Sequence, residues 1–324
     1  MSAIGEGSQL NSNVSAIAGD RVAVGEVGLM LPTFLQYRDS INSFDEIALF
    51  ARLAEESGAS CLWALDHILW PIPVFEAIDS LILAASATKN ISVGTCVMQL
   101  PLRSEIIVAK QFATLGAASG RVPILGVGIG SHPREYELLG VDYKMRGERF
   151  NRQLERLIEL REMNFLTTTK SNMSDDQYCF QPPFNSPIWI GGRGFKSLER
   201  AASYGDGWIP HSMSQKTYVG KIQILKEMLS QRGRDISEVK KGIAIYGNIT
   251  KSSSQAAEAI AWASSLFRID QSVLGKYVFT GSASQFAELI FSWGELGVDH
   301  IMVGIASDNP NRSMELLMDK VCSR

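Results

Sequence analysis

Short apolar segments alternate with longer helical patterns along most of this chain, and this alternation is the strongest constraint on its fold. Such a repeat is typical of parallel strands whose connecting helices pack on the sheet. The segment at 122–127 is continuously apolar, as expected of a strand covered on both faces. The expected strands are residues 22–31, 60–65, 91–98, 122–127, 187–190, 206–209, 243–249 and 298–303.

Eight strands of this kind are the number that closes a (β/α)8 TIM barrel. The sequence therefore predicts an α/β fold of that class, in which one domain accommodates most of the 324 residues. Residues 164–186 and 265–280 break the rhythm and are expected to be insertions near the C-terminal mouth. Ser, Gly and Asn dominate residues 1–20, which predicts a disordered tail before a single barrel domain at 21–324.

Two local patterns mark helix starts between the expected strands. Ser43 with Glu46, and Ser282 with Gln285, have the spacing of a capping box. Residues 146–163 carry apolar side chains at helical spacing, which predicts a long amphipathic helix.

Charge and cysteine content exclude several classes of protein. The net charge of −3 and the lack of a Lys/Arg-rich run argue against a nucleic-acid partner. No run of about 18 apolar residues occurs, so no membrane span is expected. The four cysteines form no CxxC pair, and the first residues lack the pattern of a secretory signal. Reduced thiols and a cytoplasmic location are therefore expected.

Three of the four histidines follow expected strands, at the end where barrel active sites lie. His67 follows the second strand, His132 the fourth and His211 the sixth, whereas His300 begins the eighth. Each alone is compatible with a hydrogen-bonded loop residue, but three on one face favour a functional set. They stand singly on different strands, without the close pairs and supporting carboxylates of metal barrels, so no metal site is predicted.

Two glycine clusters also end expected strands. The segment 126–130 resembles a dinucleotide fingerprint but lacks the third glycine of GxGxxG and follows the fourth strand instead of the first. Gly191-Gly192-Arg193-Gly194 ends the fifth strand and opens a helix. Backbone N–H groups at a helix N-terminus bind phosphate, and Arg193 can add a bidentate contact, although a simple tight turn is the alternative.

Taken together, six segments of the sequence resemble the luciferase-like monooxygenase superfamily, which includes deazaflavin-dependent reductases. The resemblance covers about residues 26–305 and is specific in combination, although not for one substrate. The segments are Trp63-Ala-Leu-Asp-His67, residues 84–95, Ala109-Lys-Gln-Phe-Ala-Thr-Leu115, residues 120–128, Pro187-Ile-Trp-Ile-Gly-Gly192 and residues 201–210.

The resemblance implies a flavin or deazaflavin ring in the barrel mouth, with its phosphate on the glycine-rich loops. It also implies a non-prolyl cis peptide at the end of the third strand, which here is Cys96–Val97. The residues that it assigns to cofactor binding are Asp66, Cys96, Val97, Met98, Ile129, Gly130, Ser131, Gly191, Gly192 and Arg193.

The pair Asp66-His67 has the form seen in the branch that uses coenzyme F420, whereas luciferase-type members carry Glu-His-His. The resemblance therefore favours F420 over FMN. Trp70 precedes a proline here, where the glucose-6-phosphate dehydrogenases of this branch have the tryptophan after one. Those enzymes also carry an acidic residue where this chain has Ser131, which argues against sugar-phosphate oxidation.

The expected reaction is hydride transfer between the deazaflavin C5 and a small organic substrate. His67 is the first candidate for general acid or base and His132 the second, because imidazole changes charge near neutral pH. Asp66 would orient His67 or accept a hydrogen bond from the cofactor. The alternatives are an FMN-dependent monooxygenase using O2 and a non-catalytic flavin-binding paralogue. The resemblance also implies a homodimer and a flavin or F420 reductase that supplies reduced cofactor.

Overall fold

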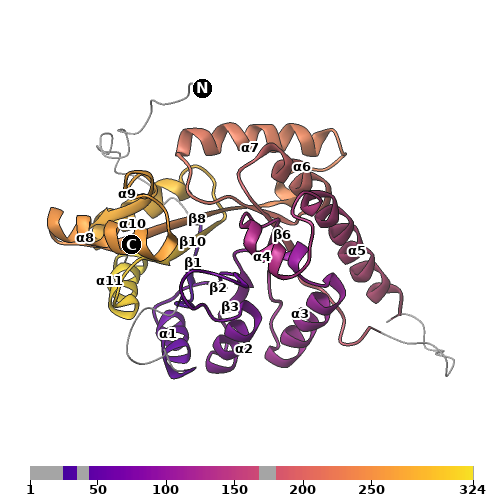
Figure 1. Cartoon of the computed structure of the whole chain (residues 1–324), viewed down its shortest axis with the longest axis horizontal. Helices are drawn as coiled ribbons and strands as arrows, with labels where there is room; N and C mark the ends of the chain where they lie inside the picture. The colour runs from indigo at the N-terminus through magenta and orange to yellow at the C-terminus, as the bar shows by residue number, and fades with distance from the viewer. Residues whose placement is uncertain (1–24, 35–43, 168–179, 324) are drawn as a thin grey trace.

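Parallel strands form the centre of the molecule and helices surround them (Figure 1). The structure is a computed structural model, and it describes residues 25–34, 44–167 and 180–323. The expected tail at 1–20 and Ser43 of the first predicted capping box lie outside these ranges. The strands are β1 (Glu26–Met30), β2 (Cys61–Ala64), β3 (Ser92–Thr95), β4 (Met98–Gln99), β5 (Leu125–Gly128), β6 (Ile188–Gly191), β7 (Gly207–Ile209), β8 (Lys240–Ile249), β9 (Val278–Gly281) and β10 (His300–Ile305).

The strands pair in the order β3-β2-β1-β10-β8-β7-β6-β5-β4, and every pairing is parallel. β3 and β4 are two parts of one barrel strand, interrupted at the Cys96–Val97 peptide. A bridge between Gly94 and Ile124 joins β3 to the start of β5 and closes the ring. All eight predicted barrel strands are present, and the predicted TIM-barrel fold is confirmed.

The expected insertion at 265–280 contains a strand that the sequence analysis missed. β9 pairs in parallel with the last four residues of β8, from Tyr246 to Ile249. A four-residue segment has little periodicity of its own, and its extended form depends on this ladder. The other expected insertion, 164–186, begins inside a helix that reaches Thr167, and its central part lies outside the described residues.

Helices cover the outside of the barrel. Figure 1 shows α1, α2 and α3 along one flank, α7 on the opposite one and α5 at the right. Gln285 and Ser282 form the predicted capping box at the start of α10. The helices are α1 (Phe44–Glu56), α2 (Ala77–Ala87), η1 (Leu100–Leu102), α3 (Glu105–Ser119), α4 (Pro133–Leu138), α5 (Arg146–Thr167), α6 (Phe195–Tyr204), α7 (Gln215–Ser230), η2 (Ile236–Glu238), α8 (Ser253–Phe267), α9 (Gln271–Leu274), α10 (Ala283–Gly294) and α11 (Pro310–Cys322).

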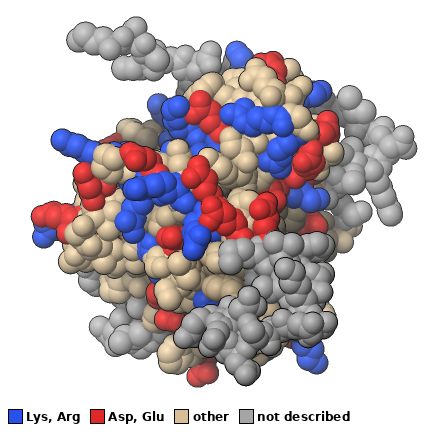
Figure 2. Space-filling view, turned by 90° about the vertical axis from the view of Figure 1, so that its right-hand side faces the viewer, with Lys and Arg blue, Asp and Glu red and all other residues tan. Residues whose placement is uncertain are grey.

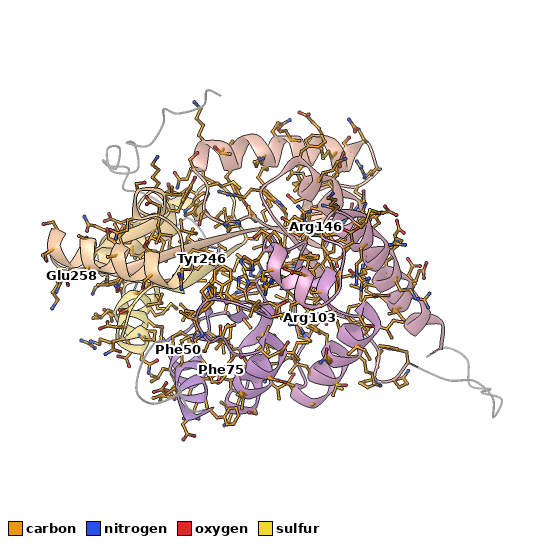
Figure 3. All side chains as sticks on the ribbon, in the orientation of Figure 1. Phe50, Phe75, Arg103, Arg146, Tyr246 and Glu258 are labelled. Carbon is orange, nitrogen blue, oxygen red and sulfur yellow. The ribbon has the colours of Figure 1, made fainter. Side chains whose placement is uncertain are left out.

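The main core lies between the barrel and its helices. Phe50 of α1, labelled in Figure 3, is fully buried there. The predicted apolar stripe of α5 places Phe150, Leu154 and Leu157 in the same cluster. Each such side chain contributes about 1.5–3 kcal/mol by leaving water, so this layer holds the helices to the sheet.

A second cluster fills the barrel interior. Trp63 and Trp189 pack there with ring centroids 5.6 Å apart. Glycines face both rings. A Cβ on Gly28 would collide with the indole of Trp63, and a Cβ on Gly207 would collide with the indole of Trp189. Large side chains opposite glycines fill the interior, which leaves the carboxyl ends of the strands as the place for a ligand.

The surface carries charges of both signs. On the face that Figure 2 shows, Lys and Arg side chains are interspersed with Asp and Glu. Exposed helices of the described chain carry short-range ion pairs, such as Arg156 with Glu159 on α5. Among the described helices, none combines the length and apolar character that crossing a bilayer requires.

Candidate active site

His67 lies in the loop that follows β2, at the carboxyl end of the barrel. Its imidazole stacks on the indole of Trp70 with centroids 4.0 Å apart and planes 30° apart. The ring of Phe34, beyond the end of β1, lies 6.4 Å away. The side chain of His67 keeps 23% of its surface exposed. The imidazole is therefore held by aromatic contacts while part of it stays accessible.

Glu135 of α4 is fully buried behind His67. Its Oε2 lies 3.3 Å from Nδ1 of His67, and its Oε1 accepts the N–H groups of Ile68 and Leu69 at 2.7 and 3.1 Å. Burial alone would raise the pKa of Glu135. Hydrogen bonds from His67, the Leu69 N–H and Gln99 outweigh burial and hold that pKa below its ordinary value. Glu135 is thus a carboxylate that anchors the loop after β2.

Gln99, the last residue of β4, connects the loops after β2 and β5. Its backbone N–H donates to Oδ2 of Asp66 at 2.8 Å. Its Nε2 lies 3.1 Å from the Asp66 carbonyl and 3.0 Å from Oε2 of Glu135. The positive φ of Gly130 brings that backbone so close that a Cβ there would collide with the Gln99 amide. Glycine is therefore required at position 130 for two reasons: the backbone has a positive φ, and a side chain would have no room beside Gln99.

Asp66 is buried and paired with Arg103, which follows η1. The guanidinium Nη2 lies 2.5 Å from Oδ1 of Asp66, and Nη1 lies 2.9 Å from Oε1 of Glu76. The sequence predicts that Asp66 orients His67 or accepts a hydrogen bond from the cofactor. Among the described residues, its carboxylate accepts hydrogen bonds from Arg103 and the Gln99 N–H and none from His67. Glu135 contacts the imidazole instead.

His132, the second expected catalytic residue, is the N-cap residue of α4. Its ring meets the edge of Trp70 at a centroid distance of 5.6 Å. Its Nδ1 is buried and has no hydrogen-bond partner among the described residues. The barrel thus brings His67 and His132 against the same tryptophan, one stacked and one edge-on, and the second has a nitrogen without a hydrogen-bond partner among the described residues.

The non-prolyl cis peptide implied by the resemblance is present between Cys96 and Val97. Val97 packs over the ends of β5 and β6, where a Cβ on Gly128 or Gly191 would come within 2.8 Å of its methyl groups. Burial raises the pKa of the Cys96 thiol to about 12, so it stays protonated at neutral pH. Met98 is fully buried in the main core, so it supports the loop from behind and does not reach the accessible surface of the mouth.

The loop after β6 leads into α6. Gly192 has φ of +120°, and its carbonyl accepts the indole N–H of Trp208 at 3.0 Å. Gly194 is the N-cap residue of α6, and no side chain caps the helix there. Arg193 is exposed, with Nη1 3.1 Å from the carbonyl of Ser212. The result is a helix N-terminus beside a solvent-facing guanidinium, the arrangement expected for a phosphate.

The backbone carbonyls of Ile129 and Ser131, on the loop after β5, each accept a hydrogen bond from a tyrosine. Tyr136 donates to the carbonyl of Ile129, and Tyr143 donates to that of Ser131 at 3.2 Å. Ser131 itself is exposed, consistent with a position on the wall of the mouth.

His211 and His300 lie at opposite ends of the barrel strands. His211 follows β7, where its backbone bridges β8 at Ala244. His300 lies at the amino end of β10, where its Nδ1 is 3.4 Å from Oε2 of Glu26. Its ring meets that of Trp189 edge-on, with centroids 4.8 Å apart. Burial lowers the pKa of His300, which favours a neutral, structural ring.

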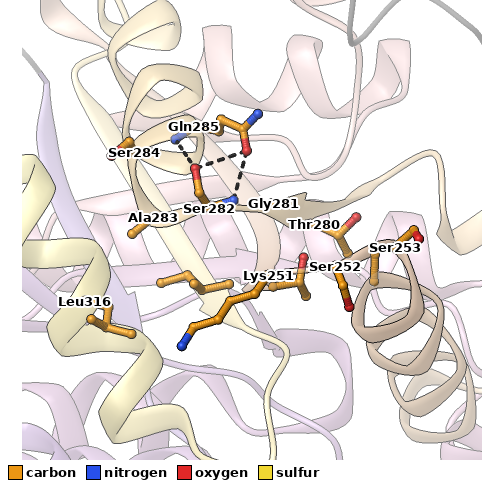
Figure 4. A pocket seen from close by; sticks show the side chains of 13 residues that line it. Lys251, Ser252, Ser253, Thr280, Gly281, Ser282, Ala283, Ser284, Gln285 and Leu316 are labelled. Carbon is orange, nitrogen blue, oxygen red and sulfur yellow. Dashed lines mark hydrogen bonds between the residues drawn. The ribbon is translucent and has the colours of Figure 1, made fainter.

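A separate hollow of about 700 Å³ lies where β8 and β9 end and α8 and α10 begin (Figure 4). Lys251 and Leu316 lie on its sides, and the capping contacts of Ser282 with Gln285 form part of its rim. None of the residues predicted for the site lines this hollow. In the described residues, no group of three or more His, Cys, Asp or Glu is placed to hold a metal ion.

Sequence reasoning missed Glu135, Gln99 and Arg103. Glu135 stands three residues after His132, in the first turn of a helix, where an acidic residue is ordinary. Gln99 and Arg103 flank a short helical turn and carry no motif. Their contacts arise only when the loops after β2, β4 and β5 meet.

A closed parallel barrel with polar and aromatic groups at its carboxyl ends defines a TIM-barrel enzyme. The family model described as luciferase-like monooxygenase matches residues 26–292, and the chain belongs to that family. The resemblance stated from the sequence is confirmed.

One relative by sequence and two solved structures are similar to this chain. An F420-dependent glucose-6-phosphate dehydrogenase from Kineococcus radiotolerans is 29% identical over 241 residues, 70% of this chain and 71% of that protein. A solved F420-dependent secondary alcohol dehydrogenase, in complex with an F420–acetone adduct, superposes with a TM-score of 0.75 at 20% identity, covering 92% and 98% of the two chains. A monooxygenase from Streptomyces bottropensis superposes with a TM-score of 0.72 at 16% identity, covering 92% and 99%. The sequence relative uses F420, and the two solved structures show that an F420-dependent dehydrogenase and a monooxygenase share this fold.

Proposed function

We propose that this protein is an F420-dependent oxidoreductase that transfers hydride between the deazaflavin and a small organic substrate. The observation that carries the proposal is His67 at the end of β2, stacked on Trp70 and backed by the buried carboxylate of Glu135. The F420-dependent relatives support the choice of cofactor, as does the Asp66-His67 pair.

Several residues at the mouth of the barrel could hold a planar ring that carries a phosphate. Cys96 and Val97 would support the ring, because Val97 covers the ends of two strands. Gly191, Gly192 and Arg193 would hold the phosphate, because α6 begins there without a side-chain cap and the guanidinium is exposed. Asp66, Met98, Ile129, Gly130 and Ser131 complete the set assigned to the cofactor, with Asp66 and Met98 acting from behind the accessible surface.

When bound, the deazaflavin supplies the carbon, C5, that accepts or returns hydride. His67 takes up the proton that the substrate loses as hydride leaves it, and returns that proton when the reaction runs in reverse. His132 offers a buried Nδ1 without a partner, which suits a hydrogen bond to a polar group of the substrate. Trp70, which contacts both imidazoles, would restrict their orientation.

Binding of F420 and FMN, measured side by side by calorimetry or tryptophan quenching, tests the cofactor. We expect F420 to bind in the low micromolar range or tighter and FMN to bind more weakly. Equal or stronger binding of FMN would reject F420 and leave the fold and family intact.

An FMN-dependent monooxygenase is the second candidate, favoured by the structural likeness to the Streptomyces bottropensis enzyme. Formation of an oxygen-reactive intermediate with reduced FMN would support it, because deazaflavins react poorly with oxygen. A non-catalytic carrier would instead show no turnover that depends on His67 or His132.

The partners proposed here rest on the resemblance to the family. A separate reductase would supply the reduced cofactor, and the protein would act as a homodimer, which sedimentation can test. Cys61, Cys96 and Cys322 are unpaired thiols, which supports a cytoplasmic location.

A further inference from the structure

The contacts of Glu135 determine which ring nitrogen of His67 can carry a proton. One carboxylate oxygen of Glu135 is occupied by the backbone N–H groups of Ile68 and Leu69, at 2.7 and 3.1 Å. The other lies 3.3 Å from Nδ1 of His67. The carboxylate is fully buried, so water does not compete for it.

An ionised carboxylate accepts hydrogen bonds and cannot donate them. The lowered pKa of Glu135 keeps it ionised at neutral pH, so Nδ1 of His67 has to be the donor in this contact. Gln99 does not reverse this polarity. Its Nε2 is 3.4 Å from Nδ1 but is also a donor, and it has better acceptors in Glu135 and the Asp66 carbonyl.

A neutral imidazole has one N–H, so Nε2 of His67 is left with its lone pair. Among the described residues, no hydrogen bond involves that nitrogen, and the ring keeps its orientation by stacking on Trp70. The nitrogen able to accept a proton is therefore on the part of the ring turned away from Glu135.

We propose that Glu135 is a positioning residue that fixes the Nδ1–H tautomer of His67 and leaves Nε2 as the proton acceptor for the substrate. A carboxylate behind an imidazole orients a general base and stabilises the imidazolium that forms when the base takes a proton. The catalytic part of this inference rests on the proposed function, whereas the tautomer is a property of the chain without cofactor.

The substitution Glu135→Gln reverses the polarity of the contact. The N–H groups of Ile68 and Leu69 still require an acceptor, so the amide oxygen faces them and the amide nitrogen faces Nδ1 of His67. Nε2 of Gln99, which contacts both carboxylate oxygens in the wild type, keeps the same oxygen as Ile68 and Leu69, at 3.1 Å. The amide nitrogen at position 135 donates, which moves the imidazole proton to Nε2 of His67. Glu135→Asp keeps an acceptor, and Glu137→Gln changes an exposed carboxylate on the same helix as a matched control.

Two-bond 1H–15N NMR spectra of cofactor-free protein labelled at histidine, at about pH 8 where an ordinary imidazole is neutral, report the tautomer directly. The signal of His67 is assigned by its loss in His67→Asn. We expect Nδ1–H in the wild type, in Glu135→Asp and in Glu137→Gln, and Nε2–H in Glu135→Gln. An Nε2–H tautomer in the wild type would overturn the proposal even if Glu135→Gln failed to fold, and so would an unchanged tautomer in a folded Glu135→Gln.

Turnover separates this inference from the proposed function. With F420 bound, Glu135→Gln should lower kcat by about 10²-fold or more, the size of a general-base contribution, with little change in the dissociation constant of F420. If the tautomer switches while kcat stays at the wild-type level, Glu135 sets the tautomer but His67 is not the base, and the proposed mechanism fails.

Discussion

Replacing Arg103 by methionine tests whether the protein itself, and not a ligand, holds the charge of Asp66. Methionine keeps much of the apolar stem and removes the guanidinium, which lies 2.5 Å from Asp66 and 2.9 Å from Glu76. Asp66, fully buried, is then left with the N–H of Gln99 at 2.8 Å as its charge-compensating contact among the described residues.

Removing one partner of a buried ion pair costs about 3–5 kcal/mol, because the remaining charge is uncompensated. The side chain of Arg103 is 15% exposed and that of Glu76 is 35% exposed, so water already screens part of the interaction. We therefore expect the lower end, about 3 kcal/mol. In a domain this large each kcal/mol shifts Tm by about 2–4 °C, so Arg103→Met should melt about 6–12 °C below the wild type.

Thermal and urea unfolding followed by circular dichroism measure this loss. Arg134→Met is the matched control, because Arg134 pairs with Glu137 on an exposed turn and should contribute about 0–1 kcal/mol. Asp66→Asn combined with Arg103→Met removes the orphaned charge, so the double variant should lose less than the sum of the two single variants. A Tm for Arg103→Met equal to that of the control, or additive losses in the double variant, would refute the reasoning and leave Asp66 free to bind the cofactor.

Three further predictions concern the mouth of the barrel. His67→Ala should reduce turnover by about 10²-fold or more with little change in F420 affinity. If His67→Ala is fully active and only His132→Ala loses turnover, the catalytic residue lies on the loop after β5. Arg193→Ala should raise the dissociation constant of F420 by about ten- to a hundredfold, as a lost charged hydrogen bond of about 1.5–3 kcal/mol implies, without lowering Tm; unchanged affinity would place the phosphate elsewhere, for example near Ser307 after β10. Because the pKa of Glu135 is lower in the folded chain, its contribution to stability is present above its ordinary pKa of 4.5 and is lost as pH falls through the folded value. The difference in Tm between the wild type and Glu135→Gln should therefore be largest near neutral pH and shrink in acid, and a difference that grows in acid would contradict this sign.

The sequence alone predicted the barrel because short apolar runs alternate along it with segments of helical periodicity. The burial of Phe150, Leu154 and Leu157 on α5 follows from their spacing, and the capping box at Ser282 from a four-residue pattern. Parallel strands end on one face, so the placement of His67 and His132 at the mouth also followed from the order of the elements.

Only the tertiary structure decided how the polar groups of the mouth pair with one another. His67 and Glu135 are 68 residues apart, and Gln99 lies 33 residues beyond Asp66. The sequence around one residue of such a pair does not indicate which residue is its partner. The contact forms only when barrel closure brings the loops after β2, β4 and β5 together. β9 also depends on a distant partner, because its four residues are extended where they form backbone hydrogen bonds with β8. Periodicity encodes which face of an element is buried, whereas the choice of partner for a buried charge depends on which loops the closed sheet places side by side.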